Sequence, residues 1–384
     1  MPDIDLTAIA VVDNHCHGLL TAFATDGTPA ADPLRWRQLF TEAPDPEMAR
    51  QHVAQSVYYR WLLHEIAAFL GCAPEEEAVL LARAGRGGTI TAALLHDARL
   101  ATLIVDEGYP PPTAVVPRPR LAELAGCQVA PLLRLEVLMQ QLIAELPTLE
   151  QVEDALRAAL QDIRGAGYLG LKSIVAYRTG LRVCEWSRDE AQAAFAIARE
   201  IVARTGGLRI AQQPLLDTLL HIAFAAAAQQ EMPVQFHCGY GDPDIDLLLG
   251  NPLHLRAVLE RPEYRRMPVV LLHECYPYTR EGAYLAAVYT NVYLDLSYGI
   301  PFLDYSEMLQ MTRAALGVAP ASKLLYSSDG VGVAELHWAS AHRGRRILGR
   351  ALGELVEQGT LTAHEAERMG QAILYENARR LYGL

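Results

Sequence analysis

The chain has 384 residues, of which 51% are hydrophobic and 20% charged, and its formal net charge is −12. This composition supports a large buried core and excludes a disordered chain. The acidic balance argues against nucleic acid as a partner, because phosphate contacts need clustered Lys and Arg. The sequence has no apolar run of roughly 18 residues, no signal-peptide pattern and no CxxC pair. We therefore expect a soluble cytoplasmic protein with no membrane partner.

Eight apolar runs recur along the chain, each followed by a helical pattern, and we interpret them as strands. They are 9–13, 100–105, 129–133, 169–175, 233–236, 269–272, 292–296 and 324–327. Continuous Val, Leu and Ile runs are typical of parallel strands covered on both faces. Eight such runs alternating with helices predict an α/β fold, a (β/α)8 TIM barrel, built as a single domain over residues 1–384. An open doubly wound sheet is the competing layout, but no GxGxxG follows the first run.

Residues 21–97 predict a helical insertion after the first strand. Within it, Asp45 as N-cap followed by Pro46 predicts one helix that runs to Gly71, and 74–84 predicts a second. The insertion either covers the barrel mouth as a lid or packs beside the barrel, and the pattern favours neither. Farther along, 109–119 is expected to be a stiff loop after the second strand. The segment 361–384 predicts helix, with Thr362 as its cap.

The end of the first strand carries a candidate metal site, because His15 and His17 lie two positions apart there. Residues two apart in a strand face the same side, so both imidazoles could point into the barrel mouth. Such a pair suits a borderline metal such as Zn²⁺. Taken alone, an HxH pair is only moderately specific for metal.

Other strand ends strengthen this interpretation. His237 ends the fifth run, His273 ends the sixth and Asp329 follows the last. Active sites of barrel enzymes are built at the C-terminal ends of their strands. One histidine in such a place could be an ordinary packed residue, whereas four histidines and an aspartate together predict a metal site.

Lys172 interrupts the fourth apolar run, where a buried charge would be expensive without a partner. Its amine could extend to solvent or pair with a carboxylate. Alternatively, carboxylation by CO₂ would turn it into a carbamate that bridges two metal ions. The sequence leaves this choice open.

The ligand pattern as a whole resembles the amidohydrolase superfamily. The stretches 170–178, 235–242, 272–280, 324–329 and 377–382 are similar to one branch, the amidohydrolase-related proteins that also occur fused to glutamine synthetase-like domains. The resemblance is specific for the fold and the metal site, and it is much less informative about the substrate. It is weakest across the helical insertion.

This resemblance implies a role for each matching residue. His15, His17 and Asp329 would hold the more buried divalent ion, expected to be Zn²⁺. His237 and His273 would hold a second ion, with carboxylated Lys172 as the bridge. In related enzymes with one metal, the strand-six histidine is free to act as a general acid or base. Lys172 favours two ions here, and Asp329 and His273 are the expected catalytic residues.

The expected reaction is hydrolysis of an amide, lactam or ester bond in a small, carboxylate-bearing molecule. Five residues near the metal ligands are candidates for substrate binding: Tyr177, Arg178, Gln235, Tyr278 and Arg280. Arg178 is the preferred carboxylate clamp, although a loop salt bridge would explain either arginine equally well. A metal-dependent decarboxylase, which is a lyase, and a non-catalytic module are the alternatives. The sequence leaves open whether the protein forms a homo-oligomer.

Overall fold

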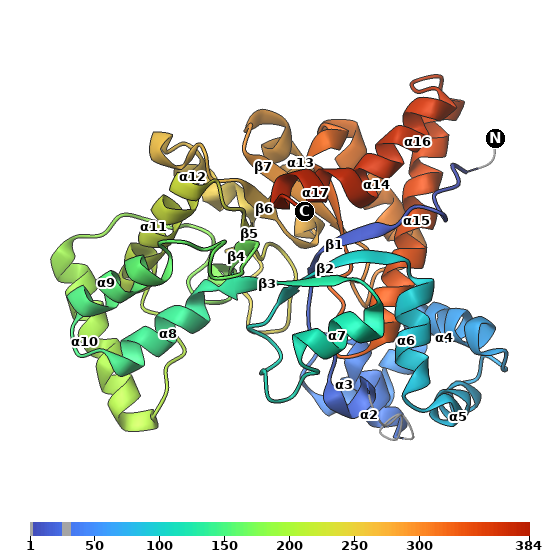
Figure 1. Cartoon of the computed structure of the whole chain (residues 1–384), viewed down its shortest axis with the longest axis horizontal. Coiled ribbons are helices and arrows are strands. Elements are labelled where there is room, and N and C mark those ends of the chain that lie inside the picture. Colours follow the sequence, from blue (N-terminus) through green and yellow to red (C-terminus); the bar gives the residue numbers. More distant parts are fainter. Residues whose placement is uncertain (1–2, 25–31) are drawn as a thin grey trace. The chain divides into compact units, whose positions relative to one another are not determined.

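The computed structural model describes residues 3–24 and 32–384 (Figure 1). Eight strands form one sheet in the order β1 to β8, and the registers of the first pair and of β3 to β7 are parallel. The fold class is a (β/α)8 barrel, as predicted. The strands are β1 (Val11–Cys16), β2 (Leu100–Asp106), β3 (Gln128–Arg134), β4 (Gly170–Ser173), β5 (Val234–Phe236), β6 (Val269–Leu271), β7 (Val292–Ser297) and β8 (Leu324–Ser327).

Each of the eight predicted strands is present, with boundaries shifted by a few residues. The first shift affects the site, because β1 extends to Cys16 and so includes His15. All six residues of β1 and all four of β8 are buried. This burial explains why the runs lack the polar alternation of a sheet with one wet face.

The helices fill the connections between strands, and among the described residues none is long and apolar enough to cross a membrane. They are α1 (Thr21–Ala24), α2 (Pro33–Arg37), α3 (Pro46–Gln51), α4 (Val57–Leu70), α5 (Glu76–Arg86), α6 (Thr89–Asp97), α7 (Arg118–Ala125), α8 (Leu135–Glu145), α9 (Leu149–Ala159), α10 (Arg188–Thr205), α11 (Gln213–Gln230), α12 (Arg256–Leu259), α13 (Thr279–Val288), α14 (Tyr305–Val318), α15 (Ala334–Glu357), α16 (Ala363–Gln371) and α17 (Asn377–Tyr382).

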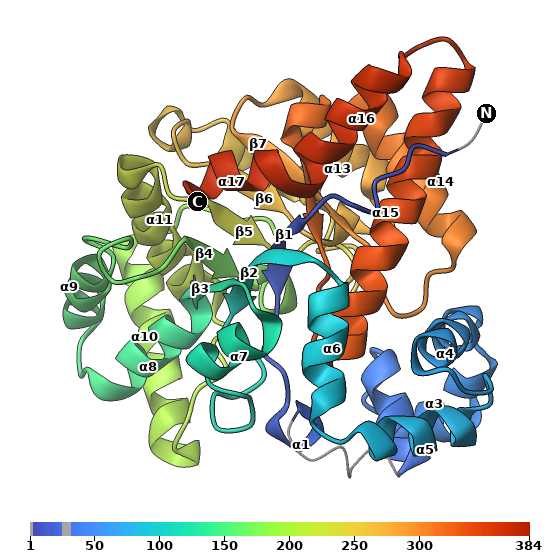
Figure 2. The ribbon, with the colours of Figure 1, turned by 45° about the vertical axis from the view of Figure 1, so that its right-hand side comes forward.

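The chain divides into two compact units. Unit 1 comprises Met1–Ala130, Gly241–Pro243 and Asp295–Leu384, and unit 2 comprises Pro131–Tyr240 and Asp244–Leu294. In unit 2, helices α8 to α11, green in Figure 1, pack against one another. In unit 1, α6 lies along the long helix α15, as Figure 2 shows.

The prediction of one continuous helix between Pro46 and Gly71 is wrong, because the structure has two α-helices there. The chain forms α3, leaves helical geometry at His52, and starts α4 after Ser56, whose hydroxyl accepts a hydrogen bond from Tyr59 N at 3.2 Å. Both caps that were predicted are present. Asp45 Oδ1 accepts from Glu47 N at 2.9 Å, and Gly71 ends α4 with φ of 72°. Ser56 is an N-cap inside an otherwise continuous helical pattern, and it divides the helix.

A buried ion pair anchors the insertion on α15. Arg83 Nε of α5 lies 2.5 Å from Glu335 Oε1, and both side chains are almost fully shielded from solvent. The guanidinium of Arg83 also stacks over the buried ring of Trp36, at 5.1 Å from the ring centroid. These contacts fix α2 and α5 against α15. Whether the predicted insertion, 21–97, serves as a lid stays a prediction, and its residues 25–31 lie outside the described part of the chain.

Two further sequence predictions concern chain segments outside the strands. The expected loop 109–119 ends two residues early, because Arg118 and Pro119 already form the first turn of α7. Proline is well tolerated there, since its missing N–H is not needed in a first helical turn. At the C-terminus, Thr362 caps α16 as predicted, in a reciprocal capping box with Glu365.

Candidate metal centre

In unit 1, three candidate ligands converge where β1 and β8 end. Asp329 Oδ1 lies 3.5 Å from Nε2 of His15 and 3.5 Å from Nε2 of His17. The two imidazole rings are 5.1 Å apart and nearly perpendicular. His15 and His17 are buried, and Asp329 is half-buried. Two imidazole nitrogens and a carboxylate oxygen at this spacing form a donor set that suits zinc or a similar divalent ion.

The loop after β2 fixes the tautomer of His17. His17 Nδ1 lies 2.9 Å from the backbone carbonyl oxygen of Tyr109. A carbonyl can only accept, so Nδ1 carries the proton and Nε2 keeps its lone pair for a metal. Hydrogen bonds of this kind commonly orient histidine ligands of metal sites. Tyr109 was not identified from the sequence, because its contribution is a backbone atom.

Asp329 has an unusual backbone conformation, with φ of 49° in the left-handed region. Its N–H donates to the carbonyl of His15 at 3.0 Å, and the carbonyl of Gly330 accepts from His17 N at 2.8 Å. Aspartate adopts this conformation more readily than most residues, yet at some cost in free energy. These two bonds hold the turn after β8 against the end of β1.

In unit 2, His237 and His273 lie together at the ends of β5 and β6. Their ring centroids are 4.5 Å apart, and Tyr177 and Tyr240 pack against them at 4.4 Å from His237 and 5.4 Å from His273. Both histidines are buried. The two histidines therefore lie side by side within this unit, and their binding of a metal ion stays a prediction.

His237 has the opposite tautomer to His17. Its Nε2 lies 2.6 Å from the backbone carbonyl oxygen of Tyr240, so Nε2 carries the proton and Nδ1 keeps the lone pair. His273 stands in a turn in which three consecutive residues, His273 to Cys275, have φ between 50° and 62°. Side-chain-bearing residues rarely occupy this region in succession, and such strained turns gather at functional sites.

Lys172 is buried in β4 and stands in register with two polar neighbours on adjacent strands. Arg134 of β3 is its partner on one side and Gln235 of β5 on the other. Registered residues of parallel strands face the same side of the sheet, so these three side chains share a face. Arg134 is the last residue of β3. It was not identified from the sequence because it directly precedes a helical pattern.

The turn after Lys172 is fixed by a buried carboxylate. Glu136 Oε1 accepts hydrogen bonds from Ser173 Oγ at 2.7 Å and from Ile174 N at 3.0 Å. Burial raises the pKa of Glu136 above its ordinary value, and these two hydrogen bonds oppose that rise. Glu136 therefore holds the backbone that follows the candidate bridging lysine.

The candidate substrate residues differ in their exposure. Gln235 is buried in β5, Tyr177, Arg178 and Tyr278 are half-buried, and Arg280 is exposed at the start of α13. Arg178 donates to the carbonyl of Tyr177 at 3.3 Å. Burial, followed by the charge of Arg209, lowers the pKa of Arg178. Among the residues that the structure describes, no carboxylate forms an ion pair with Arg178. This observation argues against a loop salt bridge as the role of Arg178.

A further carboxylate in unit 1, that of Glu42, is influenced by the charge of Asp329. Glu42 lies in the insertion, in a half-buried loop between α2 and α3. Burial, together with the negative charges of Asp329 and Asp242, raises the pKa of Glu42 to about 7. Sequence reasoning missed this residue because no motif surrounds it, and its proximity to Asp329 arises only from the fold.

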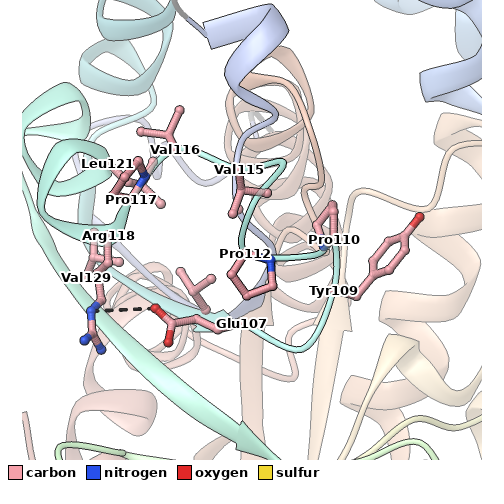
Figure 3. Close-up of a pocket in the computed structure, with 12 residues that line it drawn as sticks. Glu107, Tyr109, Pro110, Pro112, Val115, Val116, Pro117, Arg118, Leu121 and Val129 are labelled. Atoms are coloured by element: carbon pink, nitrogen blue, oxygen red, sulfur yellow. Dashed lines mark ion pairs between the residues drawn. The ribbon is translucent and has the colours of Figure 1, made fainter. Parts of the chain in front are cut away.

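A small apolar pocket adjoins the loop that carries Tyr109 (Figure 3). It has a volume of about 150 Å³, and Val115, Pro112 and Leu121 are among the side chains that line it. The ion pair between Arg118 and Glu107, 3.7 Å long, crosses one side of it. Gly18, which follows His17, also belongs to its lining. The pocket thus borders the stretch of backbone that carries His17.

Comparison with known proteins gives consistent matches. The amidohydrolase family model matches residues 148–384. Protein fluG of Emericella nidulans is 37% identical over 223 residues, which are 56% of this chain and 26% of that protein. The chain therefore spans about a quarter of the length of this curated relative.

Solved structures extend the match to the whole chain. A Lactobacillus casei protein, provisionally described as a metal-dependent hydrolase, has a TM-score of 0.85 and 27% identity, with 100% of this chain and 98% of that chain covered. Uronate isomerase of Thermotoga maritima has a TM-score of 0.69 and 14% identity, covering 98% and 95% of the two chains. The second likeness shows a shared fold alone.

Proposed function

Because this chain belongs to the amidohydrolase family, we propose that it is a metal-dependent hydrolase that cleaves an amide, lactam or ester bond in a small, carboxylate-bearing molecule. The observation that carries the proposal is the convergence of His15, His17 and Asp329, whose ligand atoms all lie within 4.8 Å of one another. The likeness to the Lactobacillus casei protein supports the same reaction class.

The donor set fits a divalent metal, and Zn²⁺ is the ion we propose. His15, His17 and Asp329 would hold one ion. The hydrogen bond from His17 to the Tyr109 carbonyl already leaves Nε2 free to bind it. When bound, such an ion acts as a Lewis acid on the scissile carbonyl and makes water a stronger nucleophile near neutral pH.

We extend the site to Lys172, His237 and His273, which would hold a second ion. In barrels of this class the C-terminal ends of the strands build one active site, and these residues stand at the ends of β4, β5 and β6. Lys172 is only 1% exposed, and a charged amine is costly to bury unless it is paired. Carboxylation of Lys172 removes that positive charge and supplies an anionic oxygen ligand in its place.

Two side chains move the protons in the proposed reaction. Asp329 accepts a proton as water attacks the acyl carbon, and it then delivers that proton to the departing nitrogen or oxygen. The hydroxyl thus joins the acyl carbon, the carbon–heteroatom bond breaks, and no redox partner is needed. If only one ion binds, His273 takes over part of this proton transfer.

Arg178 is proposed to bind the carboxylate of the substrate. A guanidinium can grip a carboxylate through two parallel hydrogen bonds. Arg178 is half-buried and, within the described ranges 3–24 and 32–384, has no ion-pair partner. A carboxylate on the substrate would supply the missing counter-charge.

The test combines metal analysis with a substrate screen. Purified protein is expected to contain close to two zinc ions per chain, and Lys172→Met to contain about one. Small carboxylated amides, lactams and lactones are then incubated with the loaded protein. Hydrolysis products that disappear in Asp329→Asn support the proposal. Release of CO₂ from a small carboxylic acid would instead show a decarboxylase, and loaded protein inert toward both classes would favour a non-catalytic module.

A further inference from the structure

A buried hydrogen-bond network lies directly behind Asp329, within unit 1. Its centre is Asp13, a fully buried residue of β1 two positions before His15. Ser328, also fully buried, satisfies both oxygens of that carboxylate: Ser328 N donates to Oδ1 at 2.9 Å and Ser328 Oγ donates to Oδ2 at 2.5 Å. A charged acceptor makes such hydrogen bonds stronger than neutral ones.

The network includes the residues on both sides of Asp329 in the sequence. Ser328 Oγ accepts a hydrogen bond from Gly330 N at 2.9 Å, in addition to its own bond to Asp13. Ser328 and Gly330 are the residues immediately before and after Asp329, whose φ is 49°. This hydroxyl therefore joins the Asp13 carboxylate to the peptide unit that follows Asp329. A left-handed aspartate persists only where its surroundings determine its conformation in this way.

His337 of α15 closes the network. Its Nδ1 lies 3.4 Å from Ser328 Oγ and 3.8 Å from Asp13 Oδ2, and its ring is completely buried. A Cβ placed on Gly330 would come within 2.8 Å of this ring. The imidazole thus packs directly under the turn that carries Asp329.

A metal site made of Asp13, Cys16 and His337 is the competing explanation, because ligand atoms of these three residues also lie within 4.8 Å of one another. Three hydrogen bonds argue against it. Both oxygens of Asp13 already accept from Ser328, and the Cys16 thiol is directed to the carbonyl of Ile104 at 3.6 Å.

We propose that Asp13, Ser328 and His337 are positioning residues that hold the Asp329 backbone in its left-handed conformation and so aim its carboxylate at His15 and His17. The proposal rests on the proposed function for the metal itself. Its test measures metal binding rather than turnover, so the positioning role and the proposed hydrolase function can fail separately. Loss of such supporting hydrogen bonds lowers metal affinity by roughly 10- to 100-fold in known metal sites.

Ser328→Ala tests the proposal, and Ser327→Ala is its matched control. Ser327 is equally buried and directly precedes Ser328, and its hydroxyl donates to a different carboxylate, Asp295 Oδ2, at 2.6 Å. Zinc affinity is measured by competition with a chromogenic chelator. The melting temperature is recorded with and without zinc, because a ligand that binds the folded state raises it.

We expect Ser328→Ala to weaken zinc binding about 10- to 100-fold and to reduce the rise in melting temperature that zinc produces. Ser328→Thr, which restores the hydroxyl, should recover the affinity. Ser327→Ala should lower the melting temperature with and without zinc alike, and leave zinc affinity unchanged. If Ser328→Ala does not fold, Asp13→Asn serves in its place and should also weaken zinc binding.

Three results would overturn the proposal. The first is wild-type zinc affinity in Ser328→Ala, and the second is an equal loss of affinity in Ser327→Ala. The third is an ion that remains when His15 and His17 are both replaced by alanine but leaves when His337 is replaced, since that ion would belong to the competing site. If wild-type protein binds zinc yet hydrolyses nothing, only the proposed function fails.

Discussion

His17 Nδ1 donates to the backbone carbonyl of Tyr109 across 2.9 Å, which joins a candidate metal ligand to the proline-rich loop after β2. In His237 the hydrogen-bonding nitrogen is Nε2 instead of Nδ1, and it donates to the backbone carbonyl of Tyr240 across 2.6 Å. The two histidines would therefore present different nitrogens to a metal.

This difference predicts two opposite tautomers in the metal-free protein. Nitrogen-15 NMR of histidine-labelled protein should show a proton on Nδ1 of His17 and on Nε2 of His237, near pH 8, where histidine is normally neutral. Alanine variants of each residue assign the signals. Tyr109→Ala should leave the His17 tautomer unchanged, because the acceptor is a backbone atom. One common tautomer for both residues would contradict the prediction.

Asp329→Asn should leave folding intact while turnover on the identified substrate falls about 10²- to 10⁴-fold. Asparagine tolerates the left-handed region as well as aspartate does, so the turn should survive. It cannot, however, accept and deliver a proton at neutral pH. The measurements are kcat and the melting temperature of zinc-loaded protein. Turnover equal to wild type at full zinc occupancy would remove Asp329 from this role.

Glu42 predicts a pH dependence of stability in the metal-free protein. Its pKa is raised to about 7, so the folded chain holds this proton more tightly than the unfolded chain does. The resulting stabilisation is fully present below the ordinary pKa of 4.5 and is lost as the pH rises through about 7.

Glu42→Gln should therefore flatten the change in urea midpoint between about pH 4.5 and 7. Glu75→Gln, which removes an exposed carboxylate of the same insertion, should leave the slope as it is in wild type. An unchanged slope in Glu42→Gln would show that the fold does not raise the pKa of Glu42.

Arg178→Lys should raise KM at least tenfold for a carboxylate-bearing substrate and change kcat little, because a lysine cannot reproduce a two-pronged guanidinium contact. A neutral analogue of the same substrate should be affected much less. Arg280→Lys is the comparison variant, and its exposed side chain leads us to expect a KM close to wild type. The reverse ranking would assign the clamp to Arg280.

The ion pair between Arg83 and Glu335 predicts that replacing one partner lowers the free energy of unfolding much more than replacing both. Arg83→Leu leaves the buried Glu335 carboxylate without its counter-charge, so the free energy of unfolding should fall by about 3–5 kcal/mol. Replacing both residues by leucine should restore most of that loss. Urea denaturation measures both changes, and equal losses in the two variants would contradict the explanation.

The sequence predicts the barrel well because each strand coincides with a mainly apolar run, which is the pattern that burial on both faces favours. The same runs reveal His237 and His273, since each is the first polar residue after its strand, and Asp329, which lies two residues after the end of β8. The break at Ser56 was missed because apolar periodicity continues across it. A hydroxyl that can cap a helix looks in sequence like any surface residue of that helix.

The supporting residues of the site are harder to predict than its ligands. Glu42 lies in a loop, His337 lies in a helix, and Tyr109 contributes only its backbone carbonyl. All three are distant in sequence from the groups with which they interact. No local spacing records such a contact. Asp13 and Ser328 do flank ligand positions, but their mutual bond becomes visible only when β1 and β8 are seen side by side.

The close approach of His337 to Gly330 limits which substitutions this region can accept. Any side chain at position 330 would place its first carbon 2.8 Å from the imidazole, a distance at which the fully buried ring has to shift. A saturation-mutagenesis library should therefore return glycine alone at this position, while Gly317, with no neighbour in reach, accepts many residues. Enzyme engineers who seek new specificity would do better to vary the Tyr109 loop and keep the turn after β8 constant.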